Sequence, residues 1–221
     1  MREHVTRTTR LLAGAGALLL AGCVSLLPEA EDLEARLGLD PGYGAAPTGV
    51  PLGVTLSVAD PRAEDVFDTA NVAVQTAPLQ YEYLAGAEWT DRAPLLLGLF
   101  LERRLEATGA FTAVSDRVGL PVADYTLHTD VRALNVDRTA GNGAEVAYGA
   151  RLTNRRGETI GSRTFRAQVP VEGKGGGAVA LALNAAAARV ADETYAWARP
   201  LIEADREAGR AREARRRERR S

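Results

Sequence analysis

An uninterrupted apolar run near the amino terminus constrains this chain more than any other feature. Residues Leu11–Ala21 are only Leu, Ala and Gly, and Arg2, Arg7 and Arg10 precede them. A basic start, a short apolar stretch and small residues at its end are typical of a secretory signal, and the run is too short to span a bilayer comfortably as a permanent helix. We therefore expect residues 1–22 to be removed as a signal peptide and the remaining chain to fold outside the cytoplasm.

The end of this run, Leu20-Ala21-Gly22-Cys23, resembles the lipobox of bacterial lipoproteins. The resemblance implies that Cys23, the only cysteine of the chain, receives a diacylglyceryl thioether and an N-acyl chain such as palmitate. Several acyl chains make an effectively permanent anchor, whereas one chain binds only marginally. The alternative is a buried free thiol, but Cys23 adjoins a signal peptide and not a core strand. No other cofactor is expected.

The residues after Cys23 bear on the membrane that holds it. Val24 and Ser25 follow, without the Asp that tends to retain enterobacterial lipoproteins in the inner membrane. By that analogy we expect the chain at the periplasmic face of the outer membrane, with the inner membrane as the alternative.

Composition limits the classes of function. The chain has 221 residues, of which 46% are hydrophobic and 25% charged, so one domain with a proper core is expected. A formal net charge of -2 gives no global attraction to nucleic acid. One cysteine excludes an intramolecular disulfide framework and cysteine zinc cages, and two histidines leave little for metal or acid–base chemistry.

Proline and glycine residues and a run of charged residues divide the chain after the signal into three segments. Residues 23–51 are expected to be the lipidated terminus and a linker, and residues 52–203 the folded domain. Residues 204–221 form an Arg-rich tail, with eight Arg and three Glu between Arg206 and Arg220. The tail is expected to be frayed and solvated. The alternative is an extension of the preceding helix that touches anionic lipid headgroups.

Hydrophobic periodicity predicts an α+β domain, in which a mainly antiparallel sheet is packed on one face by two amphipathic helices. The first helix is expected after Asp91 and ends near Gly109, and the second carries the apolar stripe from Val179 to Trp197 until Pro200 kinks or ends it. Alternating apolar residues predict strands at 54–58, 69–76, 80–84, 125–133, 146–152 and 165–169.

An ordered set of segments resembles the ABC-type transport auxiliary lipoprotein family. The set comprises Asn71–Val74, Tyr81–Tyr83, Glu88–Leu96 and Leu105–Phe111, with Trp89 and Trp197 at the positions of two tryptophans in that family. The resemblance implies a non-catalytic auxiliary component of an ABC-type intermembrane lipid transport system. Its implied partners are a periplasmic mammalian-cell-entry (MCE) domain protein and the ABC transporter complex.

Two features could contact such a partner. One is an open strand edge between Val72 and Leu84, and the other is a set of exposed aromatic residues, Tyr81, Tyr83 and Trp89. Ordinary core packing is the alternative for each aromatic residue.

Enzymatic signals are weak, and we expect no catalytic residue and no metal site. His128 lies on the polar face of a strand without a second histidine or a nucleophile, and Lys174 lies in a glycine run that lacks phosphate-loop spacing. Two alternative functions remain. One is a periplasmic interaction lipoprotein that regulates an envelope enzyme. The other is a carrier with an apolar pocket lined by Leu97, Phe100 and Leu183.

Overall fold

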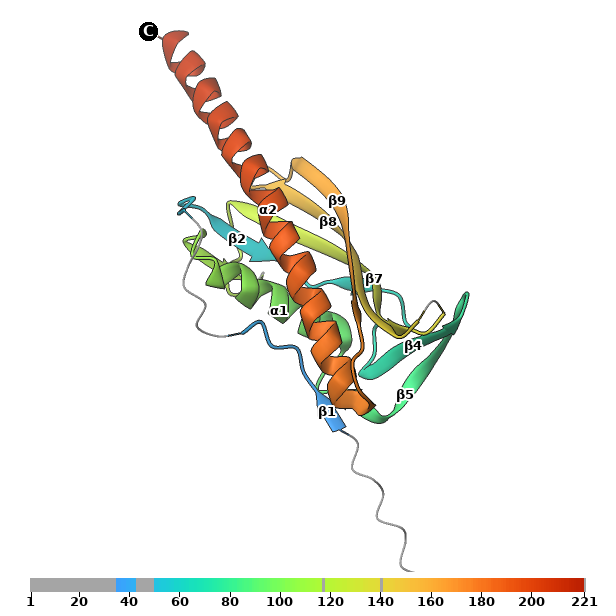
Figure 1. Cartoon of the computed structure of the whole chain (residues 1–221). Coiled ribbons are helices and arrows are strands. Elements are labelled where there is room, and N and C mark those ends of the chain that lie inside the picture. The colour runs from blue at the N-terminus through green and yellow to red at the C-terminus, as the bar shows by residue number, and fades with distance from the viewer. Residues whose placement is uncertain (1–34, 43–49, 117, 140, 221) are drawn as a thin grey trace, which may run out of the picture. The chain divides into compact units, whose positions relative to one another are not determined.

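The computed structural model describes residues 35–42, 50–116, 118–139 and 141–220. Within these residues the chain forms a mixed sheet of nine strands and two helices, which confirms the α+β class (Figure 1). The strands are β1 (Ala35–Leu37), β2 (Thr55–Val58), β3 (Arg62–Ala63), β4 (Asn71–Ala77), β5 (Gln80–Trp89), β6 (Ala113–Ser115), β7 (Tyr125–Asp137), β8 (Gly143–Asn154) and β9 (Thr159–Pro170). The helices are α1 (Ala93–Ala107) and α2 (Gly175–Glu218).

The long strand β7 organises the sheet. On one side it pairs antiparallel with β8, which pairs antiparallel with β9, as the alternation of the sequence predicts. On its other side β2, β3 and β4 follow one another along its length, and all three run parallel to it. The parallel pairings are the part of the sheet that the sequence did not predict.

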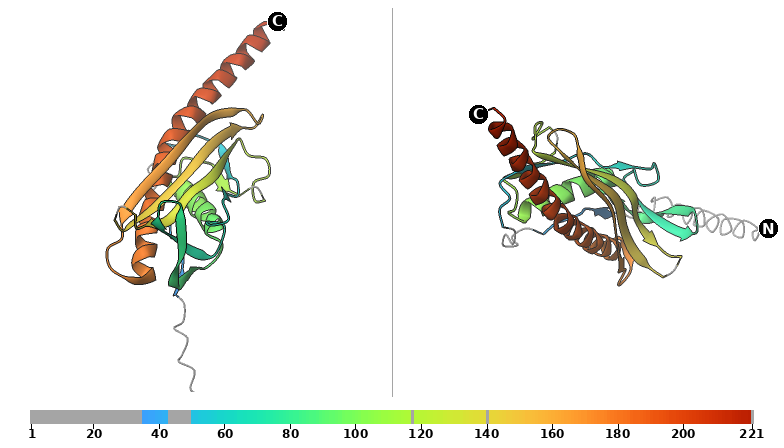
Figure 2. Two further views of the ribbon diagram at one scale, coloured as in Figure 1. Left: turned by 90° about the vertical axis from the view of Figure 1, so that its right-hand side faces the viewer. Right: turned by 90° about the horizontal axis from the view of Figure 1, so that it is seen from above.

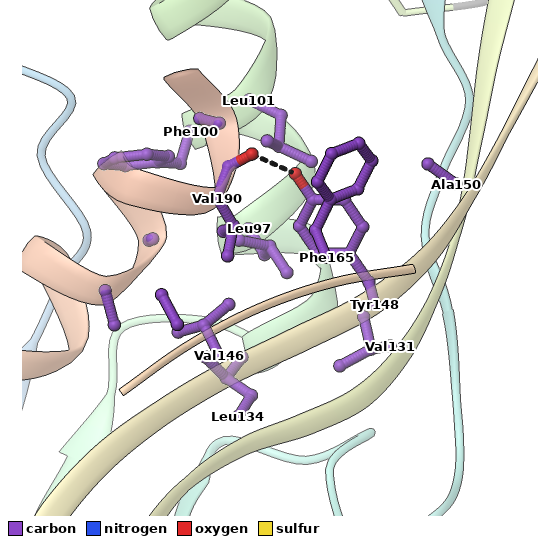
Figure 3. Close-up of a cluster of buried hydrophobic side chains, with 14 of the residues drawn as sticks. Leu97, Phe100, Leu101, Val131, Leu134, Val146, Tyr148, Ala150, Phe165 and Val190 are labelled. Carbon is purple, nitrogen blue, oxygen red and sulfur yellow. Dashed lines mark hydrogen bonds between the residues drawn. The ribbon is translucent and has the colours of Figure 1, made fainter. Parts of the chain in front are cut away.

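Both helices cover the same face of the sheet (Figure 2). Leu97 and Leu101 of α1 meet Val146 of β8 and Val190 of α2 in one core, where each is at most 1% exposed (Figure 3). The hydroxyl of Tyr148 donates to the carbonyl oxygen of Val190 at 3.3 Å. The residues of α2 that face the sheet include buried alanines, and their small side chains let the helix backbone approach the strands: Ala182, Ala186, Ala187 and Ala191.

The linker predicted at residues 23–51 extends too far, because the folded domain already includes residues 35–37. Residues 35–37 form β1, which runs parallel to the end of β5 and pairs Leu37 with Trp89. Leu37 is only 6% exposed, and the backbone N–H of Asp40 donates to Oδ1 of Asn184 at 2.7 Å. A strand of three residues is too short for alternation to reveal it, which is why the expected domain started at residue 52.

The second helix does not end at Pro200, because α2 continues to Glu218. Proline removes one backbone hydrogen bond, but the helix is held to the sheet beyond it. Ile202 is fully buried, and the Asp205 carboxylate accepts hydrogen bonds from Tyr125 at 3.1 Å and from Asn154 at 3.3 Å. The tail is therefore helical as far as Glu218 and not frayed, and this end of α2 projects beyond the sheet (Figure 1). Residues 210–220 are exposed.

The contact between Tyr125 and Asp205 predicts a weakness at alkaline pH. Burial and the nearby Asp205 carboxylate raise the pKa of Tyr125 to about 12. A pKa raised above the unfolded value of about 10 adds stability that is complete below pH 10 and is lost as the pH rises through 12. Tyr125→Phe should cost about 1 kcal/mol of unfolding free energy at pH 8. This difference from wild type should vanish between pH 10 and pH 12 in denaturant unfolding, where the hydroxyl ionises in the unfolded chain before it ionises in the folded protein.

The exposed Tyr83 provides a matched control for this experiment. Tyr83→Phe should cost little unfolding free energy at pH 8, because the Tyr83 side chain is 49% exposed. A Tyr125→Phe deficit that persists unchanged to pH 12 would contradict the role assigned to the Tyr125 hydroxyl.

Candidate functional site

The hairpin of β4 and β5 carries the aromatic residues that the sequence singles out. Near its tip Gln75 pairs with Tyr81 and Ala73 with Tyr83. Further from the tip Asn71 pairs with Glu88, so β5 accommodates Leu84–Ala87 as a bulge opposite Val72. Gly86, with φ at 71°, lies in this bulge, where its missing side chain permits the left-handed backbone. The hairpin extends away from α1 and α2 (Figure 1).

The tip of the hairpin exposes a leucine in an unfavourable backbone conformation. Pro78 and Leu79 connect the two strands, and Leu79 has a φ of 64° and an exposure of 95%. Proline followed by a residue with positive φ is the pattern of a type II turn, in which Gly or Asn normally takes the second position. A positive φ is unfavourable for leucine, and so is the exposure of its apolar side chain to water. Fold stability alone therefore does not explain the presence of leucine at position 79.

The outer side of β5 is open along most of its length. β1 pairs only with Ala87–Trp89. In the described parts of the chain, residues 80–86 pair with β4 alone. We call residues 79–86 the hairpin edge. An unpaired edge presents backbone N–H and C=O groups that can accept a strand from another chain.

Tyr81 and Tyr83 lie two residues apart on β5 and therefore share one face of the hairpin edge. Tyr81 is 39% exposed and Tyr83 49% exposed. The ring of Tyr81 meets that of Phe67 edge-on, with the ring centres 5.6 Å apart. Burial raises the pKa of Tyr81, and the charges of Glu145, Glu64 and Asp137 raise it further. Tyr81 is therefore held in place, while Tyr83 presents more of its ring to solvent.

Trp89 does not belong to this surface, which corrects its assignment as a partner-binding residue. Its side chain is fully buried, and its backbone N–H donates to the carbonyl oxygen of Ala70 at 2.7 Å. It lies where β1, β5 and the start of α1 meet, and within the described chain its indole Nε1 has no hydrogen-bond partner. Trp89 is a core residue.

Sequence reasoning missed Leu79. The available signal was the dipeptide Pro78-Leu79 between two predicted strands, which indicates a two-residue turn with an apolar residue at its apex. Cys23, the predicted lipidation site, lies outside the described residues. Among the helices that the structure describes, none is long and apolar enough to cross a membrane.

The two other residues weighed for chemistry, His128 and Lys174, lie in different parts of the fold. His128 lies on the sheet face opposite the helices, and its Nε2 is 3.3 Å from the Thr153 hydroxyl. In the described ranges no three His, Cys, Asp or Glu side chains gather closely enough to hold a metal ion. Lys174 precedes the first residue of α2 in extended backbone.

Comparison with known proteins assigns the domain to a protein family. Residues 37–194 match the family model described as the ABC-type transport auxiliary lipoprotein component. The chain belongs to this family. The match begins inside β1 and ends in α2, so it covers the sheet, α1 and the first half of α2.

Two solved structures share the fold of this auxiliary lipoprotein. Protein XCC0632 from Xanthomonas campestris, of the DUF330 family, has a TM-score of 0.65 and 26% sequence identity, and the likeness covers 78% of this chain and 96% of that one. A protein described only as uncharacterized has a TM-score of 0.55 and 16% identity, with coverage of 68% and 97%. No curated protein matches the chain.

Proposed function

We propose that this lipoprotein is a non-catalytic docking component of an ABC-type system that moves lipids between two membranes. In this proposal the acyl chains on Cys23 hold it at the periplasmic face of the outer membrane. Its domain contacts a periplasmic MCE-domain protein that is linked to the ABC transporter. Membership of the auxiliary lipoprotein family supports a role in transport and supports anchoring in the cell envelope.

The observation that carries the docking role is the hairpin edge. An open strand edge, two partly exposed tyrosines and a fully exposed leucine lie together on one projecting hairpin. Aromatic residues are enriched in protein interfaces, and an open edge can pair directly with a partner strand. The partner expected to cover this surface is an extended segment of the MCE-domain protein.

The packing of the core favours docking over the carrier alternative. A carrier needs an apolar cavity between helices and sheet, for which Leu97, Phe100 and Leu183 are the candidate lining residues. Each of them is at most 1% exposed, and all three belong to the contiguous core. Side chains therefore fill the space that a carried lipid tail would need.

Replacing Leu79 should have opposite effects on the stability of the domain and on its binding to the partner. Leu79→Asn puts a residue that tolerates positive φ at the tip and should raise the unfolding free energy by up to about 1 kcal/mol. The same change removes the apolar tip and should weaken partner binding. To measure binding, a photoreactive amino acid replaces Tyr83 in the full-length lipoprotein, and its cross-linked partners are identified by mass spectrometry in the native envelope.

The expected adduct is the MCE-domain protein, with a lower yield in the Leu79→Asn background. The control places the same photoreactive group at Leu181, which is 74% exposed on α2 and distant in sequence from the hairpin edge. An envelope-synthesis enzyme as the main adduct would favour the regulatory alternative. Equal adducts from both positions would argue against docking at the hairpin edge.

A further inference from the structure

The sheet face opposite the helices is hollowed by a cavity that the docking role does not use. Its volume is about 580 Å³, within the usual range for small-molecule sites. Its walls come from the consecutive strands β7, β8 and β9 and from β3, which lies about sixty residues earlier in the chain. The lining side chains that carry charge or hydroxyl groups include Asp60, Arg62, His128, Asp130, Arg132, Arg151, Ser162 and Thr164.

Sheet register brings three arginines to this cavity from three different strands. Arg62 of β3 lies opposite Asp130 of β7, and Arg151 of β8 lies opposite His128 of β7. Arg132 of β7 extends over Gly149 of β8 and donates from Nη1 to the Thr164 hydroxyl at 2.9 Å.

Gly149 provides the space in which Arg132 lies. A Cβ atom at position 149 would lie 2.9 Å from Nη2 of Arg132, closer than real Cβ contacts normally allow. The absence of a side chain therefore lets a guanidinium lie flat on the floor of the cavity.

These arginines differ from many others in the domain because, within the described residues, none of them forms an ion pair with a carboxylate. Arg92, Arg104 and Arg155 each form an ion pair with an aspartate. Within the described residues, Arg62, Arg132 and Arg151 form none. Arg163 also lines the cavity, but its guanidinium stacks over Phe165 at 5.1 Å.

The charge of the surrounding domain makes this cluster unusual. Residues 35–205 contain 16 Lys and Arg against 21 Asp and Glu, which is a net charge of -5. Three guanidiniums without ion-pair partners line one cavity, so they exceed its two carboxylates, Asp60 and Asp130, although the surrounding domain is acidic. Asp60 and Asp130 also line the cavity and form no ion pair in the described chain, so the site offers both signs of charge.

We propose that this cavity binds a phosphate group. A guanidinium matches two phosphate oxygens at once, and the hydroxyls of Ser162 and Thr164 offer further donors. The two aspartates favour a phosphate that also carries an ammonium group, as a phosphoethanolamine headgroup does, over a bare phosphate. The site lies on strands other than β5 and does not depend on the hairpin edge.

Titration calorimetry on the full-length lipoprotein in a neutral detergent and phosphate-free buffer tests this proposal. The two probes are inorganic phosphate and glycerophosphoethanolamine. Tighter binding of glycerophosphoethanolamine assigns the site to a lipid headgroup, and tighter binding of inorganic phosphate assigns it to free phosphate. Absence of binding by both probes overturns the proposal.

Matched variants tie the binding to the cavity. Arg132→Gln and Arg151→Gln should each weaken binding about tenfold, since each removes a charge-assisted hydrogen-bond donor. Gly149→Leu should abolish binding without changing the net charge, because it fills the floor. Arg215→Gln removes the same charge from the exposed end of α2 and should leave binding unchanged.

The control variant decides between the cavity and general charge attraction. Equal losses in Arg215→Gln and Arg151→Gln would overturn the site. So would unaltered binding in Gly149→Leu, provided that thermal unfolding shows this variant to be folded. The photo-cross-linking at Tyr83 reports separately on docking, so either proposal can fail without the other.

Discussion

Trp89→Ala should cost this domain about 3–5 kcal/mol of unfolding free energy, a large part of the stability of a typical domain. Trp89 is fully buried where β1, β5 and the start of α1 meet. Removing its indole leaves a cavity that the paired backbone on both sides cannot close, because Leu37 lies directly opposite in the β1–β5 register. Denaturant unfolding followed by circular dichroism measures the loss.

Two companion variants show that the effect comes from packing. Trp89→Phe should recover much of the stability, since the indole Nε1 has no hydrogen-bond partner among the described residues and little polar interaction is lost. Tyr83→Ala should change the unfolding free energy by less than about 1 kcal/mol, because that ring is 49% exposed. A Trp89→Ala domain as stable as wild type would contradict the position assigned to this side chain.

Loss of the Cys23 thiol should move the protein from the membrane to the soluble fraction. Each buried methylene of an acyl chain contributes about 0.8 kcal/mol, so removing two or three chains abolishes the anchor. Cys23→Ser alone leaves the apolar run Leu11–Ala21 attached if the signal stays uncleaved. The informative variant therefore combines Cys23→Ser with exchange of residues 1–22 for the cleavable signal of a soluble periplasmic protein.

Fractionation of the envelope, with mass spectrometry of the mature amino terminus, measures this result. Ser25→Ala in the native lipoprotein is the control and should remain with the membrane. If the exchanged Cys23→Ser protein still sediments with membranes, a second attachment must exist and the lipid-anchor model fails.

Alternation in the sequence predicted the part of the fold in which neighbouring strands are also neighbours in the chain. Strands β7, β8 and β9 repeat apolar and polar residues with period two, and short turns set their pairing. Helix α1 was equally visible, because Pro94 lies in its first turn and Gly109 follows its end. Local patterns were enough for these elements.

Long-range contacts decided what the sequence could not predict. No local pattern indicates that β1, only three residues long, pairs with β5, because that pairing depends on a strand about fifty residues later. Pro200 is a helix-ending signal by itself, yet the burial of Ile202 and the contacts of Asp205 carry α2 past it. The sequence alone allows Trp89 to be either exposed or buried, because its burial depends on the pairing of β1 with the end of β5.

The candidate docking surface was predicted in part. The two tyrosines and the open edge of β5 follow from a short aromatic strand that starts after Pro78. The first half of the predicted edge, Val72–Ala77, is not open, because β4 pairs with β5 on one side and with β7 on the other. The role of Leu79 depends on its φ of 64°, which composition does not reveal. The cavity on the opposite face depends on cross-strand register, which brings Arg62, Arg132 and Arg151 together although they lie far apart in the sequence.

The arrangement of strands along β7 imposes an order on folding. Leu56 pairs with Tyr125 and Ala73 with Asn135, so β2 and the β4–β5 hairpin can join one sheet only once residues 125–137 are available. Such distant pairing slows folding and leaves strand edges uncovered in the meantime. Strands that wait for a distant partner in this way are open to aggregation until β7 is available to pair with them.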